Sequence, residues 1–172
     1  MKRTVILIAQ FHSFSPTWPG LRFWVAFGIG MNFHLLSVNT ICEYLGEQKC
    51  RALPFFHVFT GCDTTSGFRG KEKKSAWQAW KAYPQGTEAF LFVNDSPFLP
   101  LEINTPVFDV LQRSLMILYD GTSIATDMNT ARQELFRKEN QALQDIPPTK
   151  VRTYHTQILD FCVYNRLHQC VR

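Results

Sequence analysis

The sequence predicts an α/β fold with a short parallel sheet and a mainly helical C-terminal half. Three observations support this class. Residues 5–9 (VILIA) form a short, continuous apolar run, which is typical of a strand buried on both faces of a parallel sheet. A second strand is predicted over residues 21–27, before the flexible Gly28, because one set of side chains alternates with another: Leu21, Phe23, Val25 and Phe27 with Arg22, Trp24 and Ala26. From Ser37 onward, apolar residues instead recur at helical spacing.

The first predicted helix begins at Ser37, a favourable N-cap, and ends at Gly46, which can adopt a left-handed conformation. Between them, apolar side chains recur every three or four residues: Val38, Ile41, Cys42 and Leu45. A second, short helix is predicted over residues 52–59. Pro54 fits its first turn, where a backbone N–H would have no helical partner anyway.

The C-terminal half is predicted to contain three further helices. Residues 61–70 are rich in glycine, threonine and serine, so they predict a turn, and a helix over residues 75–83 follows until Pro84. An amphipathic stripe over residues 107–118 predicts the next helix. Asp127 is expected to cap the last one.

The length and composition are those of one folded domain. The chain has 172 residues, of which 45% are hydrophobic and 14% aromatic. This is enough apolar material for a sizeable core, and it excludes disordered and collagenous proteins. Eighteen Lys and Arg residues against 14 Asp and Glu residues give a formal charge of +4. The first acidic residue is Glu43, so the opening quarter of the chain is basic.

The cysteines and the apolar segments predict an intracellular protein, nuclear or cytoplasmic. Five cysteines are an odd number and no secretory signal pattern is present, so free thiols are expected rather than a disulfide scaffold. Residues 23–42 lack charged side chains, but their apolar run ends at Met31 and is far shorter than the ~18 residues of a membrane span. No membrane partner is therefore expected.

The most informative motif is residues 53–77, LPFFHVFTGCDTTSGFRGKEKKSAW. Together with the rest of residues 37–149, it resembles a large group of uncharacterised, mobile-element-associated proteins that share the signature LPxxHxxTGCDTTSxxxGxxKK. That signature in turn resembles PIN-like and flap-endonuclease-type nucleases. The resemblance implies a partial PIN-like three-layer sandwich over residues 1–150, followed by a divergent C-terminal tail over residues 151–172. It also implies that the chain is truncated at its N-terminus.

The glycine-rich turn within this motif has the chemistry of a DNA-backbone-binding site. Glycines let a phosphate approach backbone N–H groups without a Cβ in the way, and the neighbouring cations neutralise its charge. The residues predicted to bind nucleic acid are Gly67, Arg69, Gly70, Lys71, Lys73 and Lys74, and Lys81 adds a further cation. The structural alternative is a solvated lysine face on an ordinary helix.

Asp63 is predicted to be the catalytic and metal-binding carboxylate of this site. By the resemblance, it would hold Mg²⁺ or Mn²⁺ for phosphodiester cleavage; alternatively, it caps the turn that follows. The related chains carry an Asp-x-Asp before the first apolar run, where this sequence has Lys2 and Thr4. Other carboxylates that could approach it are Asp95, Glu102 and Asp109.

Three functions follow from these observations. The first is a degenerate PIN-like nuclease domain that keeps its DNA-backbone-binding turn but lacks most metal-binding carboxylates. The alternatives are an active divalent-metal-dependent nuclease that uses Asp63, and a non-catalytic remnant whose incomplete sheet is covered by a partner chain.

The remaining histidines, tryptophans and C-terminal cysteines are not predicted to form a functional site. His57 and the pair Trp77 and Trp80 lie at helical spacing among apolar residues, so they are expected in the core. The C-terminal histidines and cysteines match no compact zinc finger: His155, Cys162, His168 and Cys170.

Overall fold

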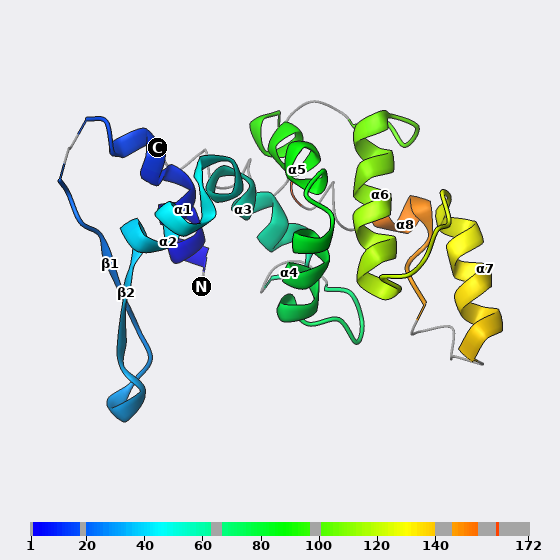
Figure 1. Cartoon of the computed structure of the whole chain (residues 1–172), viewed down its shortest axis with the longest axis horizontal. Helices are drawn as coiled ribbons and strands as arrows, with labels where there is room; N and C mark the ends of the chain where they lie inside the picture. Colours follow the sequence, from blue (N-terminus) through cyan, green and yellow to red (C-terminus); the bar gives the residue numbers. More distant parts are fainter. Residues whose placement is uncertain are drawn as a thin grey trace. The chain divides into compact units, whose positions relative to one another are not determined.

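The computed structural model describes residues 2–17, 20–62, 67–96, 101–139, 146–154 and 161. These residues form eight α-helices, one 3₁₀ turn and a two-stranded sheet (Figure 1). They divide into two compact units, Met1–Pro54 and Phe55–Arg172, and the residues of each unit contact mainly one another. None of the helices in the described ranges is long and apolar enough to cross a membrane.

The first unit contains a helix, a hairpin and two further helices. Its elements are α1 (Lys2–Phe14), β1 (Trp24–Phe27), η1 (Gly30–Asn32), β2 (His34–Ser37), α2 (Val38–Leu45) and the first part of α3 (Glu47–Phe59). The strands pair antiparallel, with Trp24 opposite Ser37 and Phe27 opposite His34. Gly28 begins the connection with a φ of 90°, and a Cβ there would lie 1.9 Å from the carbonyl oxygen of Asn32. Only glycine fits this position without a backbone shift.

The strand predicted over residues 5–9 is wrong, because these residues lie within α1. Ile8, Ala9 and Phe11 are buried, whereas Ile6 is 41% exposed. This is the burial pattern of one helix face. A five-residue apolar run fits either a buried strand or a buried helix, and its local periodicity cannot separate the two. The choice is made by the packing of α1 against α2.

The mixed α/β class is confirmed in its coarse form, and the described part of the chain is mainly helical. The predicted strand over residues 21–27 is confirmed in its second half as β1. The sheet of the described residues is antiparallel rather than parallel, because β1 reverses through the Gly28 turn and pairs with β2. The PIN-like three-layer sandwich stays a prediction.

The hairpin exposes many large apolar side chains. Phe23 and Val25 pack against the core of the first unit, but side chains along and beyond the strands are exposed: Trp24, Phe27, Ile29, Met31, Phe33, Leu35 and Leu36. Exposed apolar groups of this kind are unusual on a monomer surface. The predicted partner chain stays a prediction.

The helix predicted from Ser37 to Gly46 is confirmed as α2. The Ser37 hydroxyl accepts a hydrogen bond from the Thr40 amide, and Gly46 ends the helix with a φ of 76°. The next helix is longer than the predicted 52–59. It begins at Glu47, so Pro54 lies in its interior rather than its first turn. Burial of its apolar side chains, including Cys50 and Phe55, offsets the local cost of the proline, about 3 kcal/mol.

The second unit is mainly helical in its described residues. After the end of α3 it contains α4 (Lys73–Ala82), α5 (Gly86–Asp95), α6 (Pro106–Tyr119), α7 (Met128–Glu139) and α8 (Lys150–Thr153). The helix α6 is central, because α4, α5 and α7 all pack against it (Figure 1). The predicted helices over residues 75–83 and 107–118 are confirmed as α4 and α6. Asp127 caps α7 by accepting hydrogen bonds from two backbone amides.

The helix α5 is absent from the sequence prediction. Pro84 and Gly86 end α4 as expected, but Gly86 also begins α5. A Cβ on Gly86 would lie 3.0 Å from the Ser114 Oγ of α6, so the glycine permits close helix packing. The apolar residues that follow then form a helix whose buried side chains include Ala89, Phe90 and Val93.

Aromatic rings form the core of the second unit. The Phe56 ring stacks on Trp80 with centroids 4.7 Å apart, and Phe90 packs against both. Trp80 Nε1 donates a 2.9 Å hydrogen bond to the Thr87 hydroxyl. The expected burial of Trp80 and His57 is confirmed.

One described residue beyond position 154 also contributes to this core. Phe161 is fully buried, and its ring centroid lies 4.9 Å from that of Phe55. The predicted division between residues 1–150 and 151–172 stays a prediction.

Candidate functional site

The turn between α3 and α4 carries the predicted nucleic-acid-binding residues, and Lys73 holds its two ends together. Lys73 Nζ donates to the carbonyl of His57 at 2.7 Å, to the hydroxyl of Thr60 at 2.8 Å and to the carbonyl of Gly61. An ammonium has three N–H donors, so each has a protein acceptor. The ammonium also lies at the C-terminal end of α3, where the helix carbonyls carry partial negative charge. Lys73 therefore links the first turn of α4 to the last turn of α3.

Phe68 anchors the same turn from inside. Its side chain is 6% exposed and packs against Phe59 and Tyr119, with ring centroids 5.5 and 6.4 Å away. Gly67 lies against the end of α3, because a Cβ there would be 3.4 Å from the Thr60 carbonyl oxygen. Gly70 has a φ of +69° and open space around its Cα. Gly67 and Phe68 are therefore packed against neighbouring helices, while Gly70 has open space for an approaching group.

Three cations of the predicted set lie at the surface of this turn. Arg69 and Lys74 are exposed, and Lys71 is half-buried. Lys71 Nζ lies 4.8 Å from the centroid of the Tyr119 ring, a cation–π contact that orients its ammonium. Lys81 is exposed too and follows Lys74 by seven residues of α4, two helical turns or ~10 Å, so it lies on the same face.

The predicted catalytic residue, Asp63, lies outside the described residues. Within the described ranges, Asp95, Glu102 and Asp109 do not belong to any group of three ligands close enough to hold an ion. Asp109 instead accepts a 3.1 Å hydrogen bond from the Gln112 side chain in its own helix. The predicted Mg²⁺ or Mn²⁺ site at Asp63 stays a prediction.

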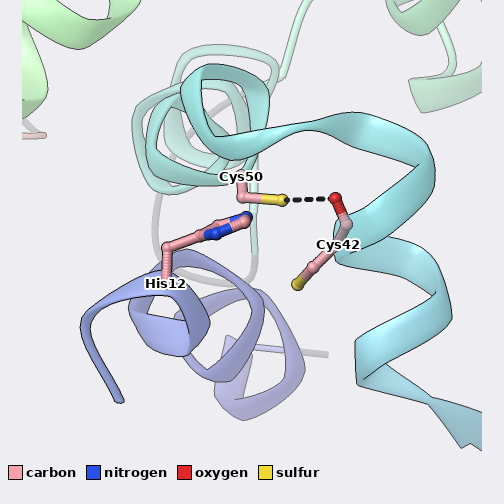
Figure 2. Close-up of side chains that lie close together, drawn as sticks. All are labelled: His12, Cys42 and Cys50. Atoms are coloured by element: carbon pink, nitrogen blue, oxygen red, sulfur yellow. Dashed lines mark hydrogen bonds between the residues drawn. The ribbon is translucent and has the colours of Figure 1, made fainter. Parts of the chain in front are cut away.

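A different cluster of metal-binding side chains lies in the first unit. Figure 2 shows the imidazole of His12 and the sulfur atoms of Cys42 and Cys50 around a common point. One ligand atom from each residue lies within 4.8 Å of the others. His12 is in the last turn of α1, Cys42 is in α2 and Cys50 is in α3. Three helices thus each contribute one side chain.

The polar atoms of this cluster make only weak bonds to the protein. The thiol of Cys42 donates to the Ile8 carbonyl at 3.6 Å, and that of Cys50 donates to the Cys42 carbonyl at 3.9 Å, the dashed line in Figure 2. His12 Nε2 is buried and has no hydrogen-bond partner. A buried nitrogen without a partner costs about 1–3 kcal/mol.

The surroundings of the two thiols are apolar. Both cysteines are 0% exposed and lie in a core formed with Ile8, Phe11 and Val38. Burial raises the pKa of the Cys42 thiol to about 12, and the neighbouring Cys50 raises it further. Burial also raises the pKa of Cys50. Without a nearby cation, both groups are therefore neutral thiols at physiological pH.

Sequence patterns alone do not predict this cluster. Cys42 lies on the predicted apolar face of a helix, and His12 belongs to no motif. The predicted free thiols are confirmed for Cys42, Cys50 and Cys62. The two clustered cysteines are eight residues apart and the histidine lies 30 residues upstream, which is no compact zinc-ligand spacing.

No family model, curated protein or solved structure matches the chain. The resemblance to mobile-element-associated and PIN-like proteins thus stays a prediction.

Proposed function

We propose that the second unit binds nucleic acid through its phosphate backbone, as a degenerate PIN-like nuclease domain. The observation that carries this function is the anchored turn with surface cations. Phe68 and Lys73 hold residues 67–73 against α3, while Arg69, Lys71 and Lys74 carry positive charge. A segment that is fixed before binding loses less conformational entropy than a mobile one, so this arrangement favours phosphate contact over a merely solvated lysine face.

The backbone adds to the attraction. The helix α4 has ten residues, and the Glu72 side chain at its N-cap makes no capping hydrogen bond. Amides at a helix N-terminus favour an anion, and Lys74 lies in the same first turn. Gly70, with open space at its Cα, allows close approach. The nearby Glu72 carboxylate opposes this attraction, so moderate affinity is expected.

Binding without cleavage is the proposed activity. It is supported by Lys2 and Thr4 at the positions of two expected carboxylates. In addition, Asp95, Glu102 and Asp109 do not by themselves form a group of three metal ligands among the described residues. Lys73 has a positioning role, since its donors already have protein acceptors. Its effect on binding would come through the shape of the turn.

The test is a fluorescence-anisotropy titration of the full chain against a short labelled DNA duplex at several salt concentrations. Three exposed cations, Arg69, Lys74 and Lys81, predict a slope of about −2.7 in log affinity against log salt. This slope corresponds to a loss of about 40-fold between about 50 and 200 mM salt. The duplex sequence is expected to have little influence.

A matched pair of charge reversals locates the contact. Lys74→Glu should reduce the magnitude of the salt slope by at least about 1, because one phosphate contact is lost. Arg137→Glu makes the same change in net charge on an exposed residue of α7, and it should alter the affinity by less than about twofold. No binding at low salt, or equal losses for the two variants, would reject the proposed function. Cleavage with Mg²⁺ or Mn²⁺ that disappears in Asp63→Ala would favour the nuclease alternative instead.

A further inference from the structure

We propose that His12, Cys42 and Cys50 bind one Zn²⁺ ion in the first unit, a site that is independent of the nucleic-acid-binding turn. The ligand atoms already lie within 4.8 Å of one another. In a tetrahedral site with Zn–S bonds of about 2.3 Å, two sulfur atoms are about 3.8 Å apart. A contraction of at most about 1 Å, within side-chain reach, therefore brings all three atoms to an ion.

The identities of the donor atoms select the ion. Two sulfurs and one imidazole nitrogen are ligands for Zn²⁺ and Cu⁺, whereas Mg²⁺ and Ca²⁺ require oxygen ligands. Binding of Zn²⁺ releases two protons from the thiols of Cys42 and Cys50 to solvent. The two thiolates, the neutral imidazole and the dication then form an assembly with no net charge. The same ligands around Cu⁺ would leave a net negative charge in an apolar core, which is costly.

The burial of the ligands supports this choice. His12 Nε2 lacks a hydrogen-bond partner, and the two thiols make only long bonds to carbonyls. A metal ion would satisfy all three groups at once. Zinc also accepts a fourth ligand, and with three protein ligands that position is open to a water molecule or another donor.

The expected role of the ion is to hold the three helices of a small unit together. The unit comprises Met1–Pro54, a size at which an apolar core alone is marginal. The ligands come from α1, α2 and α3, so the ion would cross-link the whole helical part of the unit. Removal of zinc should loosen these helices first.

The experiment measures metal in the full chain, purified under reducing conditions without chelators. Elemental analysis should find one zinc per chain, with a dissociation constant below about 1 μM. Zinc at about 100 times this constant should raise the melting temperature of the metal-free chain by at least about 5 °C. Cobalt in place of zinc should give the sulfur-to-cobalt absorption of two thiolates.

Variants assign the ligands. Cys42→Ser and Cys50→Ser should each remove about half of the sulfur-to-cobalt absorption, and His12→Phe should weaken zinc binding by at least about tenfold. Cys62→Ser, which removes a thiol from the second unit, is the matched control and should retain full absorption. If the ligand variants do not fold, X-ray absorption of the zinc-loaded wild-type chain counts sulfur and nitrogen neighbours directly.

Four results would overturn the zinc site. They are no metal and no cobalt absorption in a chain that melts cooperatively, full absorption in both cysteine variants, binding of Cu⁺ without Zn²⁺, and a disulfide between Cys42 and Cys50 that persists in protein purified under reducing conditions. A failure of nucleic-acid binding would leave this site unaffected, because its ligands lie in the other unit.

Discussion

Replacement of Lys73 by methionine tests whether this lysine serves the fold or the ligand. Methionine keeps an apolar stem of similar length but removes the ammonium. The carbonyls of His57 and Gly61 and the hydroxyl of Thr60 would then lose their shared donor at the end of α3. The favourable charge at this helix C-terminus would be lost as well.

The expected loss of stability is about 2–3 kcal/mol. A hydrogen bond to a charged group contributes about 1.5–3 kcal/mol. Three acceptors share one Lys73 ammonium, and this half-buried site admits water to the released groups, so the three bonds do not add fully. At about 4 °C per kcal/mol, the melting temperature should fall by about 10 °C.

Urea denaturation followed by circular dichroism and tryptophan fluorescence measures this change. Lys74→Met is the matched control, because its side chain is exposed on the next residue of the same helix. It should cost less than about 0.5 kcal/mol.

The DNA titration should show the opposite ranking. At a temperature well below the melting temperature of the variant, Lys73→Met should bind DNA with the wild-type salt slope. Lys74→Met should reduce the magnitude of the salt slope by about 1. The reasoning fails if Lys73→Met is as stable as the control, or if it reduces the salt slope as much as Lys74→Met does.

Four further predictions follow from individual side chains. Trp80→Phe should lower the unfolding free energy by about 1–2 kcal/mol in urea, because the buried Thr87 hydroxyl loses the indole N–H. Asp127→Ala should cost about 1 kcal/mol in the same assay, since two amides of α7 lose their cap. In the metal-free chain, Cys42 should be alkylated more slowly than the partly exposed Cys62 at mildly alkaline pH, as followed by peptide mass spectrometry. Folding raises the pKa of the Cys42 thiol from 9.0 to about 12, so the thiol ionises first in the unfolded chain. The contribution of Cys42 to the unfolding free energy is therefore complete below pH 9 and is lost as the pH rises toward 12. A melting temperature of the metal-free chain that rises over this pH range would contradict this assignment.

The helix boundaries that could be predicted are those set by residues close to them in the sequence. Ser37 and Asp127 accept hydrogen bonds from amides a few residues ahead, and Gly46 needs only its own φ, so these positions could be recognised without tertiary information. The amphipathic stripe of α6 could be recognised too, because six of its residues turn to one buried face.

Some residues of the basic turn could be assigned a role from the sequence, and others could not. Arg69, Lys71 and Lys74 belong to one contiguous motif, so their proximity follows from chain connectivity alone. The different role of Lys73 could not be predicted, because the carbonyl of His57 lies 16 residues away in another helix. Neighbouring lysines with the same charge thus differ only through packing.

Local sequence is sufficient for the helix caps, the helical C-terminal half and the basic turn, because each depends on contacts within one or two helical turns. Packing between distant segments is needed to make residues 5–9 a helix, to make the sheet of the described residues antiparallel, and to bring His12 to Cys42 and Cys50. The backbone hydrogen bonds of a buried apolar run can be formed in either a helix or a strand, so the segment that packs against the run determines its conformation. Ligands on three separate helices come together only when those helices pack.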